Sequence, residues 1–245
     1  MEKNTPAIEI KNLHKTFGDK TVLDGIDVTV NKGEDVVILG RSGAGKSVTI
    51  KCIVGLVKPD KGAVKVFGTD VTKLNAKELN EIRTRIGFMF QNGALYDSMS
   101  VRQNLAFTLK HHNKNISKEE TEEKITEALD NVGLLEAIDK MPSELSGGMQ
   151  KRIGMARTLI VKPEIILYDE PTSGLDTITS REISELMVAI QKKNKTASII
   201  ITHDLACAKL TADRIIVLQD GVIAEEGTYA QLEKSKNPSV QAFFK

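Results

Sequence analysis

The chain has 245 residues, of which 40% are hydrophobic and 27% are charged, and its 34 basic and 33 acidic residues give a net charge of +1. This length suits one large α/β domain and excludes long repeat arrays and fused enzymes, while the composition excludes intrinsic disorder. Because the charges balance, no uniform basic field favours nucleic acid, and we expect no nucleic-acid partner.

The cysteines and the lack of long apolar segments indicate in which cellular compartment the protein is expected. Cys52 and Cys207 stand far apart in apolar segments, which favours two reduced core thiols over a disulfide framework. The first residues lack the apolar stretch of a signal peptide, and no segment approaches the ~20 apolar residues that span a bilayer. We therefore expect a cytoplasmic protein, in which another chain supplies any membrane spans.

The beginning of the chain has the alternating pattern of strands. Apolar and polar residues alternate over residues 7–10 and 22–30, with turn residues at 18–19 and 31–33, which predicts a small β layer. Residues 36–39 form a continuous apolar run instead. Such a run is typical of a parallel strand buried on both faces.

A glycine-rich segment, GRSGAGKS, follows this buried run and matches the pattern G-x-x-x-x-G-K-[ST] before a helix expected near Val48. Glycines let backbone N–H groups converge on phosphates, and the helix N-terminus adds a favourable dipole. Lys46 is predicted to reach the β- and γ-phosphate oxygens, and Ser47 to ligate Mg²⁺. The alternative is a glycine-rich turn without a ligand. The predicted ATP-binding residues from this segment are Gly40, Arg41, Ser42, Gly43, Ala44, Gly45, Lys46, Ser47 and Val48.

Gln91 follows the strand-like residues 86–90 and is predicted to bridge metal, water and an adjoining helical region, with an ordinary polar strand end as the alternative. The following residues read as helical, and Ser117 with Glu120 predicts a capping box. We therefore expect one domain with a helical subdomain inserted over about residues 96–159. The core and the β subdomain then cover about residues 1–95 and 160–245.

The segment LSGGMQ, residues 145–150, precedes a helix expected to run through Leu159. Ser146, Gly147 and Gly148 predict a second anion-binding helix start, with a plain helix cap as the alternative. Met149 and Gln150 complete the segment. In a head-to-tail pair, each nucleotide would lie between residues 40–47 of one chain and residues 146–148 of the other. We therefore expect an ATP-dependent homodimer.

Two later apolar strands end in chemically active residues. Asp169 and Glu170 end one strand, where buried carboxylates require a compensating cation. Asp169 is predicted to hold Mg²⁺ through water, and Glu170 to accept a proton from, or to orient, the water that attacks the γ-phosphate. The alternative is a carboxylate pair that caps the next helix. His203 ends the strand at residues 198–202 and is predicted to contact the γ-phosphate, although a histidine there is more often structural.

These strand-to-loop junctions predict a parallel α/β sheet with its ligand site at the carboxyl ends of the strands. Residues 214–218 and 222–224 flank an Asp220–Gly221 turn, which predicts a type I′ hairpin at the end of the sheet.

Taken in order, these motifs resemble those of the nucleotide-binding subunits of ATP-binding cassette (ABC) transporters. The resemblance implies an ATPase with the cofactors ATP and Mg²⁺ and a P-loop NTPase fold, which has a RecA-like parallel-sheet core, an N-terminal antiparallel β subdomain and an inserted α-helical subdomain. It identifies Gln91 with the Q-loop, Asp176 with the D-loop and His203 with the switch histidine. Phe17 stands where the family carries an aromatic residue, commonly tyrosine, that stacks on adenine.

Within this family, QNGALYDSMSV at residues 91–101, NLAF at residues 104–107 and the LSGGM signature are similar to the MlaF-like ATPase of Mla-type phospholipid transport. This resemblance implies a subunit on the inner face of the cytoplasmic membrane, an MlaE-like integral permease and an MCE-type substrate-binding protein. The alternatives are an amino-acid importer, a lipoprotein exporter, or an ABC ATPase with a regulatory or assembly role. Because the chain ends at Lys245, we expect a long C-terminal arm to be missing or short.

The apolar side chains after Gln91 have two possible roles. They either form a groove that receives an apolar helix of the permease or pack in the core. These side chains are Leu95, Tyr96, Met99, Leu105 and Phe107.

Overall fold

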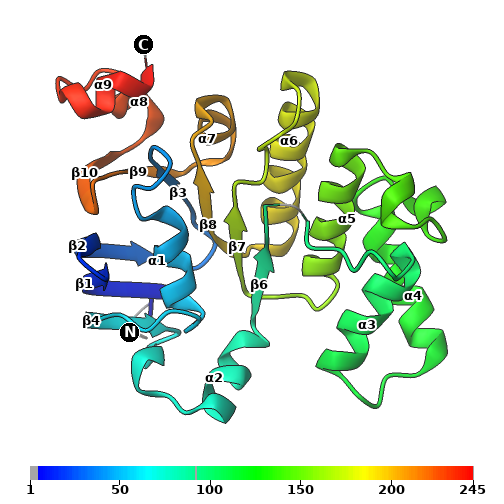
Figure 1. Ribbon diagram of the computed structural model, residues 1–245. Helices are drawn as coiled ribbons and strands as arrows, with labels where there is room; N and C mark the ends of the chain where they lie inside the picture. The colour runs from blue at the N-terminus through cyan, green and yellow to red at the C-terminus, as the bar shows by residue number, and fades with distance from the viewer. Residues whose placement is uncertain (1–4, 92, 245) are drawn as a thin grey trace.

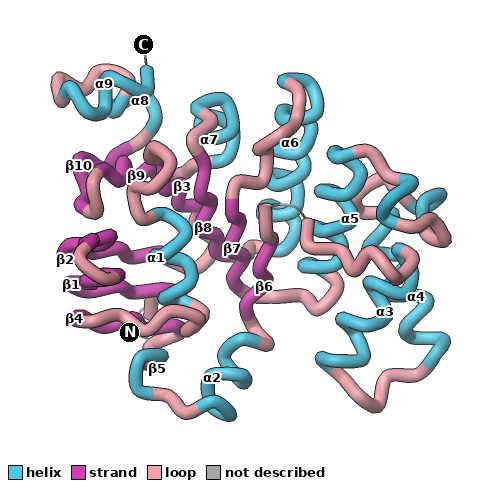
Figure 2. The backbone as a smooth tube through the Cα atoms, viewed as in Figure 1, coloured by secondary structure: helices cyan, strands magenta, loops and turns pink. Residues whose placement is uncertain are grey.

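Two sheets and a group of helices make up the fold (Figure 1). The computed structural model describes residues 5–91 and 93–244, so the expectations that involve residues 1–4, Asn92 and Lys245 lie outside the described residues. Figure 2 shows the strands gathered on one side of the molecule and the helices α3 (Val101–His112), α4 (Lys118–Asp130) and α5 (Gly147–Leu159) on the other.

The first sheet is the predicted β layer, and it is antiparallel with strand order β2-β1-β4-β5. Its strands are β1 (Ile8–Phe17), β2 (Lys20–Val30), β4 (Lys61–Val66) and β5 (Thr69–Asp70). β1 extends to Phe17, beyond the predicted residues 7–10. Its pairing register with β2 shifts between Ile10 and Leu13, and Asn12 in this segment has a φ of 48°. This bulge interrupts the alternation of apolar residues that a sequence pattern relies on.

The second sheet has the order β10-β9-β3-β8-β7-β6. Its strands are β3 (Asp35–Leu39), β6 (Ile86–Met89), β7 (Ile165–Asp169), β8 (Ala197–Thr202), β9 (Arg214–Gln219) and β10 (Val222–Gly227). The pairs from β9 to β6 are parallel, as predicted, and β10 is antiparallel to β9. Asp220 and Gly221 join the last two strands with φ angles of 49° and 82°, the positive values that a type I′ turn requires.

The remaining helices follow the strands. They are α1 (Lys46–Ile53), α2 (Ala76–Arg83), α6 (Thr177–Asn194), α7 (Leu205–Thr211), α8 (Tyr229–Leu232) and α9 (Pro238–Phe244), with short 3₁₀ helices at Val71–Lys73, Leu135–Ala137 and Pro142–Glu144. Ser117 caps α4 by accepting a hydrogen bond from the backbone N–H of Glu120, but the predicted reciprocal bond is not among the contacts of this cap. The Glu120 carboxylate pairs with Lys124 at 2.8 Å instead.

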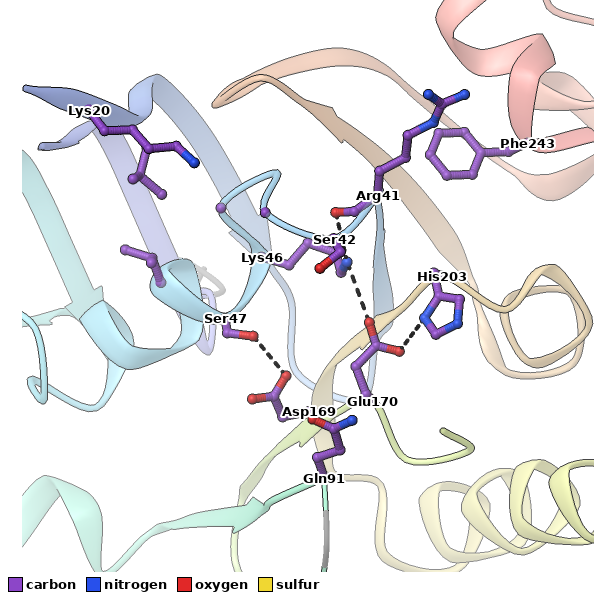
Figure 3. A pocket seen from close by; sticks show the side chains of 14 residues that line it. Lys20, Arg41, Ser42, Lys46, Ser47, Gln91, Asp169, Glu170, His203 and Phe243 are labelled. Carbon is purple, nitrogen blue, oxygen red and sulfur yellow. Dashed lines mark hydrogen bonds and ion pairs between the residues drawn. The ribbon is translucent and has the colours of Figure 1, made fainter. Parts of the chain in front are cut away.

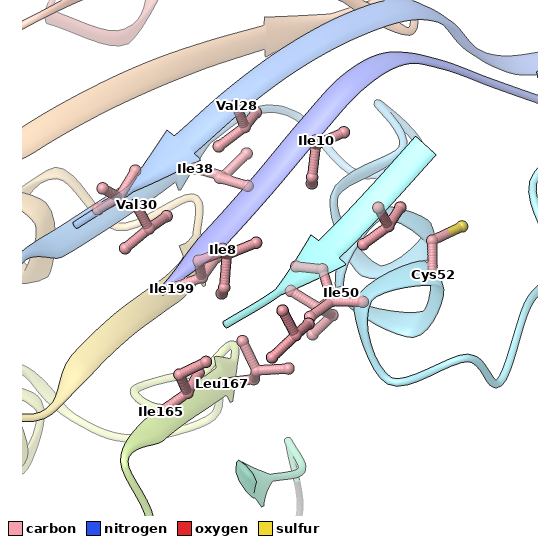
Figure 4. Close-up of a cluster of buried hydrophobic side chains, with 14 of the residues drawn as sticks. Ile8, Ile10, Val28, Val30, Ile38, Ile50, Cys52, Ile165, Leu167 and Ile199 are labelled. Carbon is pink, nitrogen blue, oxygen red and sulfur yellow. The ribbon is translucent and has the colours of Figure 1, made fainter. Parts of the chain in front are cut away.

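Three clusters of buried apolar side chains hold these layers together. The first lies between the two sheets and α1 and includes Cys52 (Figure 4). The second covers the other face of the parallel sheet, and the third joins α3, α4 and α5. Helix α5 enters both, through Met155 and Ile153 respectively. The predicted boundaries of the helical subdomain, at about residues 96 and 159, stay a prediction.

Both cysteines are buried and free, and burial raises the pKa of each thiol to about 11. A thiol that stays protonated is unreactive, as expected of small core residues. Among residues 5–91 and 93–244, no helix combines the length and the apolar character needed to cross a membrane.

Asp35, at the start of β3, is a buried carboxylate. It is 5% exposed, and its Oδ1 has no hydrogen-bond partner among the described residues. Among the buried side-chain nitrogen and oxygen atoms in the part of the chain that the structure describes, only Thr196 Oγ1 shares this condition. Burial raises the pKa of Asp35 to about 7; a hydrogen bond with Ser198 opposes this shift, and the charges of Asp213 and Glu34 add to it.

Asp35→Asn is therefore expected to stabilise the protein at alkaline pH. The unfolded carboxyl loses its proton near pH ~3.9, whereas the folded one keeps it until about 7. Because the folded state binds more protons between these values, wild-type stability falls as the pH rises through them. The free energy of unfolding of the variant should exceed that of wild type by about 1–3 kcal/mol near pH ~8, and by a smaller amount near pH ~4. Urea unfolding at both pH values measures this, and a difference independent of pH would contradict it.

Candidate functional site

A cleft of about 640 Å³ lies at the carboxyl ends of the parallel strands, around the loop between β3 and α1 (Figure 3). Side chains of the loop and of the end of β7 line the cleft together with Gln91 and His203. The lining residues are Lys20, Val22, Arg41, Ser42, Gly43, Gly45, Lys46, Ser47, Val48, Gln91, Asp169, Glu170, His203 and Phe243. Of the residues predicted from the loop, Gly40 and Ala44 are buried and do not line this cleft.

The glycine-rich loop is pressed against neighbouring strands. A Cβ at Gly45 would lie 2.7 Å from the carbonyl oxygen of Val22, and the φ of Gly45 is 106°. A Cβ at Gly40 would lie 2.6 Å from the carbonyl oxygen of Leu218. Both positions therefore require glycine, since a side chain would push the loop away from β2 and β9.

Lys46 begins α1 and is 6% exposed. Its Nζ donates to the carbonyl oxygens of Gly40 at 2.7 Å and Arg41 at 3.2 Å, and it lies 3.4 Å from Glu170 Oε1. These oxygens compensate for the burial of the ammonium group. The loop thus curls around a fixed positive charge at a helix N-terminus, an arrangement that suits a phosphate group.

The predicted metal ligands lie together. Ser47 Oγ donates to Asp169 Oδ1 at 3.0 Å, and Gln91 lines the same cleft. A hydroxyl, an amide and a carboxylate supply the hard oxygen atoms that Mg²⁺ prefers, and Mg²⁺ commonly takes its remaining ligands from water and substrate phosphates. The residues present therefore fit Mg²⁺ bound together with a nucleotide.

Glu170 connects the loop with His203. Its Oε1 faces Lys46, and its Oε2 lies 2.8 Å from His203 Nδ1. The Glu170 side chain is 15% exposed and the His203 side chain 62% exposed, so the carboxylate lies inside the cleft and the imidazole at its edge. The structure thus places His203 against Glu170, a contact that sequence reasoning did not predict.

Lys151, on α5, is a buried residue that the sequence analysis missed. Its Nζ donates to the carbonyl oxygen of Glu170 at 3.2 Å, and burial lowers the pKa of Lys151 against the opposing charge of Glu170. Glu170 has a φ of 51°, an uncommon value for a residue with a side chain. In sequence Lys151 stands next to Arg152, and nothing distinguishes it there from a solvated lysine.

The loop after Gln91 packs tightly on α5. A Cβ at Gly93 would lie 2.9 Å from the carbonyl oxygen of Gln150, and a Cβ at Gly154 would lie 2.8 Å from the Cα of Gly93. Arg157 donates to the carbonyl oxygens of Gly93, at 3.2 Å, and Ala94. Gln91 is therefore connected through its loop to the helix that Ser146 begins.

Asn104, fully buried on α3, organises the next part of this loop. Its Oδ1 accepts from the Tyr96 N–H at 2.8 Å, and its Nδ2 donates to the carbonyl oxygens of Met99 at 2.9 Å and Ser100 at 3.1 Å. One amide side chain thus adds hydrogen bonds to the backbone of residues 96–100, beside the backbone bond from the Met99 N–H to the Tyr96 carbonyl oxygen.

Asn104→Ala is expected to lower the free energy of unfolding by about 2–3 kcal/mol, because it removes part-buried hydrogen bonds to the backbone of Tyr96, Met99 and Ser100. Lys110→Ala, at an exposed position of the same helix, provides the control. Urea unfolding of both variants measures the difference. Equal stability of the two would show that the loop does not depend on this amide.

The five apolar side chains after Gln91 divide into two groups. Leu105 is fully buried, and Leu95 and Met99 are half-buried, so these three mainly pack in the fold. Tyr96 and Phe107 are 46% and 44% exposed, and their rings contact edge to face at 5.2 Å. Of the five side chains, Tyr96 and Phe107 are therefore the ones exposed enough to contact another protein.

The signature segment does not reach the cleft of its own chain. Ser146 caps α5 by accepting from the Met149 N–H at 3.3 Å, and Gln150 Nε2 donates to the Pro142 carbonyl oxygen at 2.9 Å. None of residues 146–150 lines the cleft. Their predicted action on a second chain stays a prediction.

Two further predicted residues also lie outside the cleft lining. Asp176 caps α6, and its hydrogen bonds with Thr179 lower the pKa of its carboxyl. Phe17 ends β1, is 49% exposed, and has Lys15 Nζ 5.1 Å from its ring centroid. Its predicted stacking on adenine stays a prediction.

Comparison with known proteins identifies similar sequences. A family model described as ABC transporter matches residues 23–173. The probable ribonucleotide transport ATP-binding protein mkl of Mycobacterium leprae (strain TN) is 40% identical over 237 residues, which cover 97% of this chain and 68% of that protein. The methionine import ATP-binding protein MetN of Brucella abortus (strain 2308) is 39% identical over 224 residues, which cover 91% of this chain and 60% of that protein.

Solved structures share the fold. The ATP-binding cassette MJ0796, in a dimeric post-hydrolysis state bound to ADP and Pi, has a TM-score of 0.82 and 32% identity over 90% of this chain and 98% of that one. The structure of cbiO1 from Clostridium perfringens, part of the ABC transporter complex cbiONQ, has a TM-score of 0.86 and 29% identity over 95% and 92%. These likenesses confirm the predicted cassette fold.

Proposed function

The chain belongs to the ABC transporter family as an ATP-hydrolysing cassette. We propose that the cleft described above is the site of ATP hydrolysis. We also propose that the transported substrate is a phospholipid. One observation carries the first part of the proposal. Lys46, the Ser47–Asp169 pair and Glu170 meet in one cleft although they come from separate segments of the chain.

The catalytic roles follow from the contacts in the cleft. The backbone of residues 40–47 and the Lys46 ammonium bind the β- and γ-phosphates. Ser47, Gln91 and, through water, Asp169 would hold Mg²⁺, which when bound neutralises charge on the phosphate oxygens. Glu170 accepts a proton from the attacking water. The hydrogen bond between its Oε2 and His203 fixes the carboxylate, and His203 lies at the cleft edge where it would meet the γ-phosphate.

The proposal includes a second copy of the chain. Residues 146–150 would complete the nucleotide site of the partner, since they carry a helix N-terminus that is not used in their own cleft. Asp176 would lie at the same contact between chains. The likeness to a cassette solved as a dimer with ADP and Pi supports this arrangement.

The permease is proposed to bind over the aromatic pair Tyr96–Phe107. Tyr96 lies on the loop that Asn104 holds in place, and Phe107 lies on α3 beside it. The loop contacts α5 through Arg157. Gln91 begins the same loop. A shift of α5 during ATP binding would therefore be passed to the permease, an arrangement that suits a subunit on the inner face of the membrane.

Phospholipid is proposed as the substrate because residues 91–101 and 104–107 are similar to those of Mla-type ATPases. That similarity also suggests an MlaE-like permease and an MCE-type protein as partners. A second candidate is methionine or another amino acid, favoured by the 39% identity with MetN. The transported substrate contacts the partner chains and not the cassette. The sequence of the cassette therefore contains few residues that distinguish the two candidates.

Isolation of the tagged chain from detergent-solubilised membranes tests the substrate proposal. We expect mass spectrometry to identify a permease with an MCE-type protein, and the reconstituted complex to move labelled phospholipid between vesicles only with ATP. An amino-acid permease with its binding protein would favour the second candidate. A complex without any membrane chain would reject transport.

A further inference from the structure

The proposed ATP cleft has an aromatic wall that no sequence motif predicts. Phe243, on α9, lines this cleft and also a second hollow of about 600 Å³. The two hollows share Lys20, Arg41 and Ser42, so they adjoin each other across the glycine-rich loop. In Figure 3 the Phe243 ring and the Arg41 side chain lie on the same side of the loop, away from Lys20. Phe17, the aromatic residue predicted for this site, lines neither hollow.

Helix α9 is fixed to the body of the protein. Val240 is fully buried in the second apolar cluster, and Asn237 Nδ2 donates to the Ala224 carbonyl oxygen at 3.3 Å. The Phe244 ring contacts the Tyr229 ring edge to face at 5.2 Å. Neighbouring residues of a helix point in directions about 100° apart. Both phenylalanines pack against the second apolar cluster, but they point apart: Phe244 contacts α8, and Phe243 lines the cleft.

We propose that Phe243 forms one side of the nucleotide site and slows the release of bound nucleotide; this inference rests on the proposed ATP function. A half-buried ring beside Arg41 and Ser42 keeps water from that side of the phosphate loop, where lower hydration strengthens electrostatic contacts. The ring face also offers an apolar surface to the base or the ribose.

The chain contains no tryptophan, which provides a direct test. Phe243→Trp and Phe244→Trp each introduce one fluorophore at neighbouring positions of the same helix. Addition of Mg-ATP is expected to change the emission of the first variant and to leave that of the second nearly unchanged. Phe17→Trp, measured in the same way, shows which aromatic positions lie near the nucleotide.

Release kinetics supply the second measurement. Phe243→Ala is expected to weaken Mg-ATP binding by about three- to tenfold, mainly through faster release of a fluorescent ATP analogue. Phe244→Ala is the matched control and should bind and release the analogue like wild type. If Phe243→Ala fails to fold, the emission of the tryptophan variants still decides the question.

Two results would overturn the inference. One is a silent Phe243→Trp variant in a protein that binds Mg-ATP by calorimetry, and the other is an unchanged release rate in folded Phe243→Ala. Failure of the wild-type chain to bind Mg-ATP in calorimetry would instead reject the proposed function, and this inference with it.

Discussion

Replacing Glu170 with glutamine is expected to lower the rate of ATP hydrolysis about 10²- to 10⁴-fold, the usual contribution of a general base. The amide keeps the size of the side chain but cannot accept a proton from water. Lys46 retains the carbonyl oxygens of Gly40 and Arg41 as acceptors, so the phosphate loop should keep its shape and Mg-ATP should still bind. Phosphate release and calorimetry measure the two quantities separately.

Glu164→Gln provides the matched control for this variant. Glu164 directly precedes β7, the strand that leads into Glu170, and its carboxylate pairs with Arg85 at 2.6 Å outside the cleft. Its replacement should leave turnover within about twofold of wild type, as expected for an exposed ion pair. A Glu170→Gln variant that turns over as fast as this control would show that another group handles the proton.

Lys46→Ala is expected to weaken ATP binding by about 100-fold or more, because it removes the ammonium group that the loop encloses. The contacts of Lys46 with Gly40 and Arg41 show that its head group is held where the loop backbone converges. Calorimetry with Mg-ATP measures the change.

Lys51→Ala, at an exposed position of the same helix α1, is the control for charge alone. It should bind Mg-ATP nearly as wild type does. Equal affinity of Lys46→Ala and Lys51→Ala would contradict the assignment of Lys46 to the phosphates.

The sequence predicts the parts of the site that follow from local rules. A buried strand followed by glycines, lysine and a helix has few structural solutions, so residues 40–47 and their loop could be identified from spacing alone. Parallel strands end at one edge of a sheet, which brought Asp169, Glu170 and His203 to the same cleft. The Ser47–Asp169 contact at 3.0 Å agrees with that reasoning.

Contacts between distant segments could not be predicted in this way. The buried position of Lys151, the loop held by Asn104 and the ring of Phe243 in the cleft depend on how helices pack, and no local pattern encodes them. Helix α2 packs Leu79 and Ile82, both half-buried, against the first cluster, and this apolar pattern is too short to identify from the sequence. The end of β1 was missed because the bulge near Asn12 breaks the alternation.

The most direct test of the proposed ATP site is the mass of the Glu170→Gln protein in solution, measured by light scattering with and without Mg-ATP. If Lys46 and Ser47 of one chain and residues 146–148 of another enclose the nucleotide, the variant should become a dimer that retains one ATP per chain. A monomer at saturating Mg-ATP, or a dimer without bound nucleotide, would contradict this account.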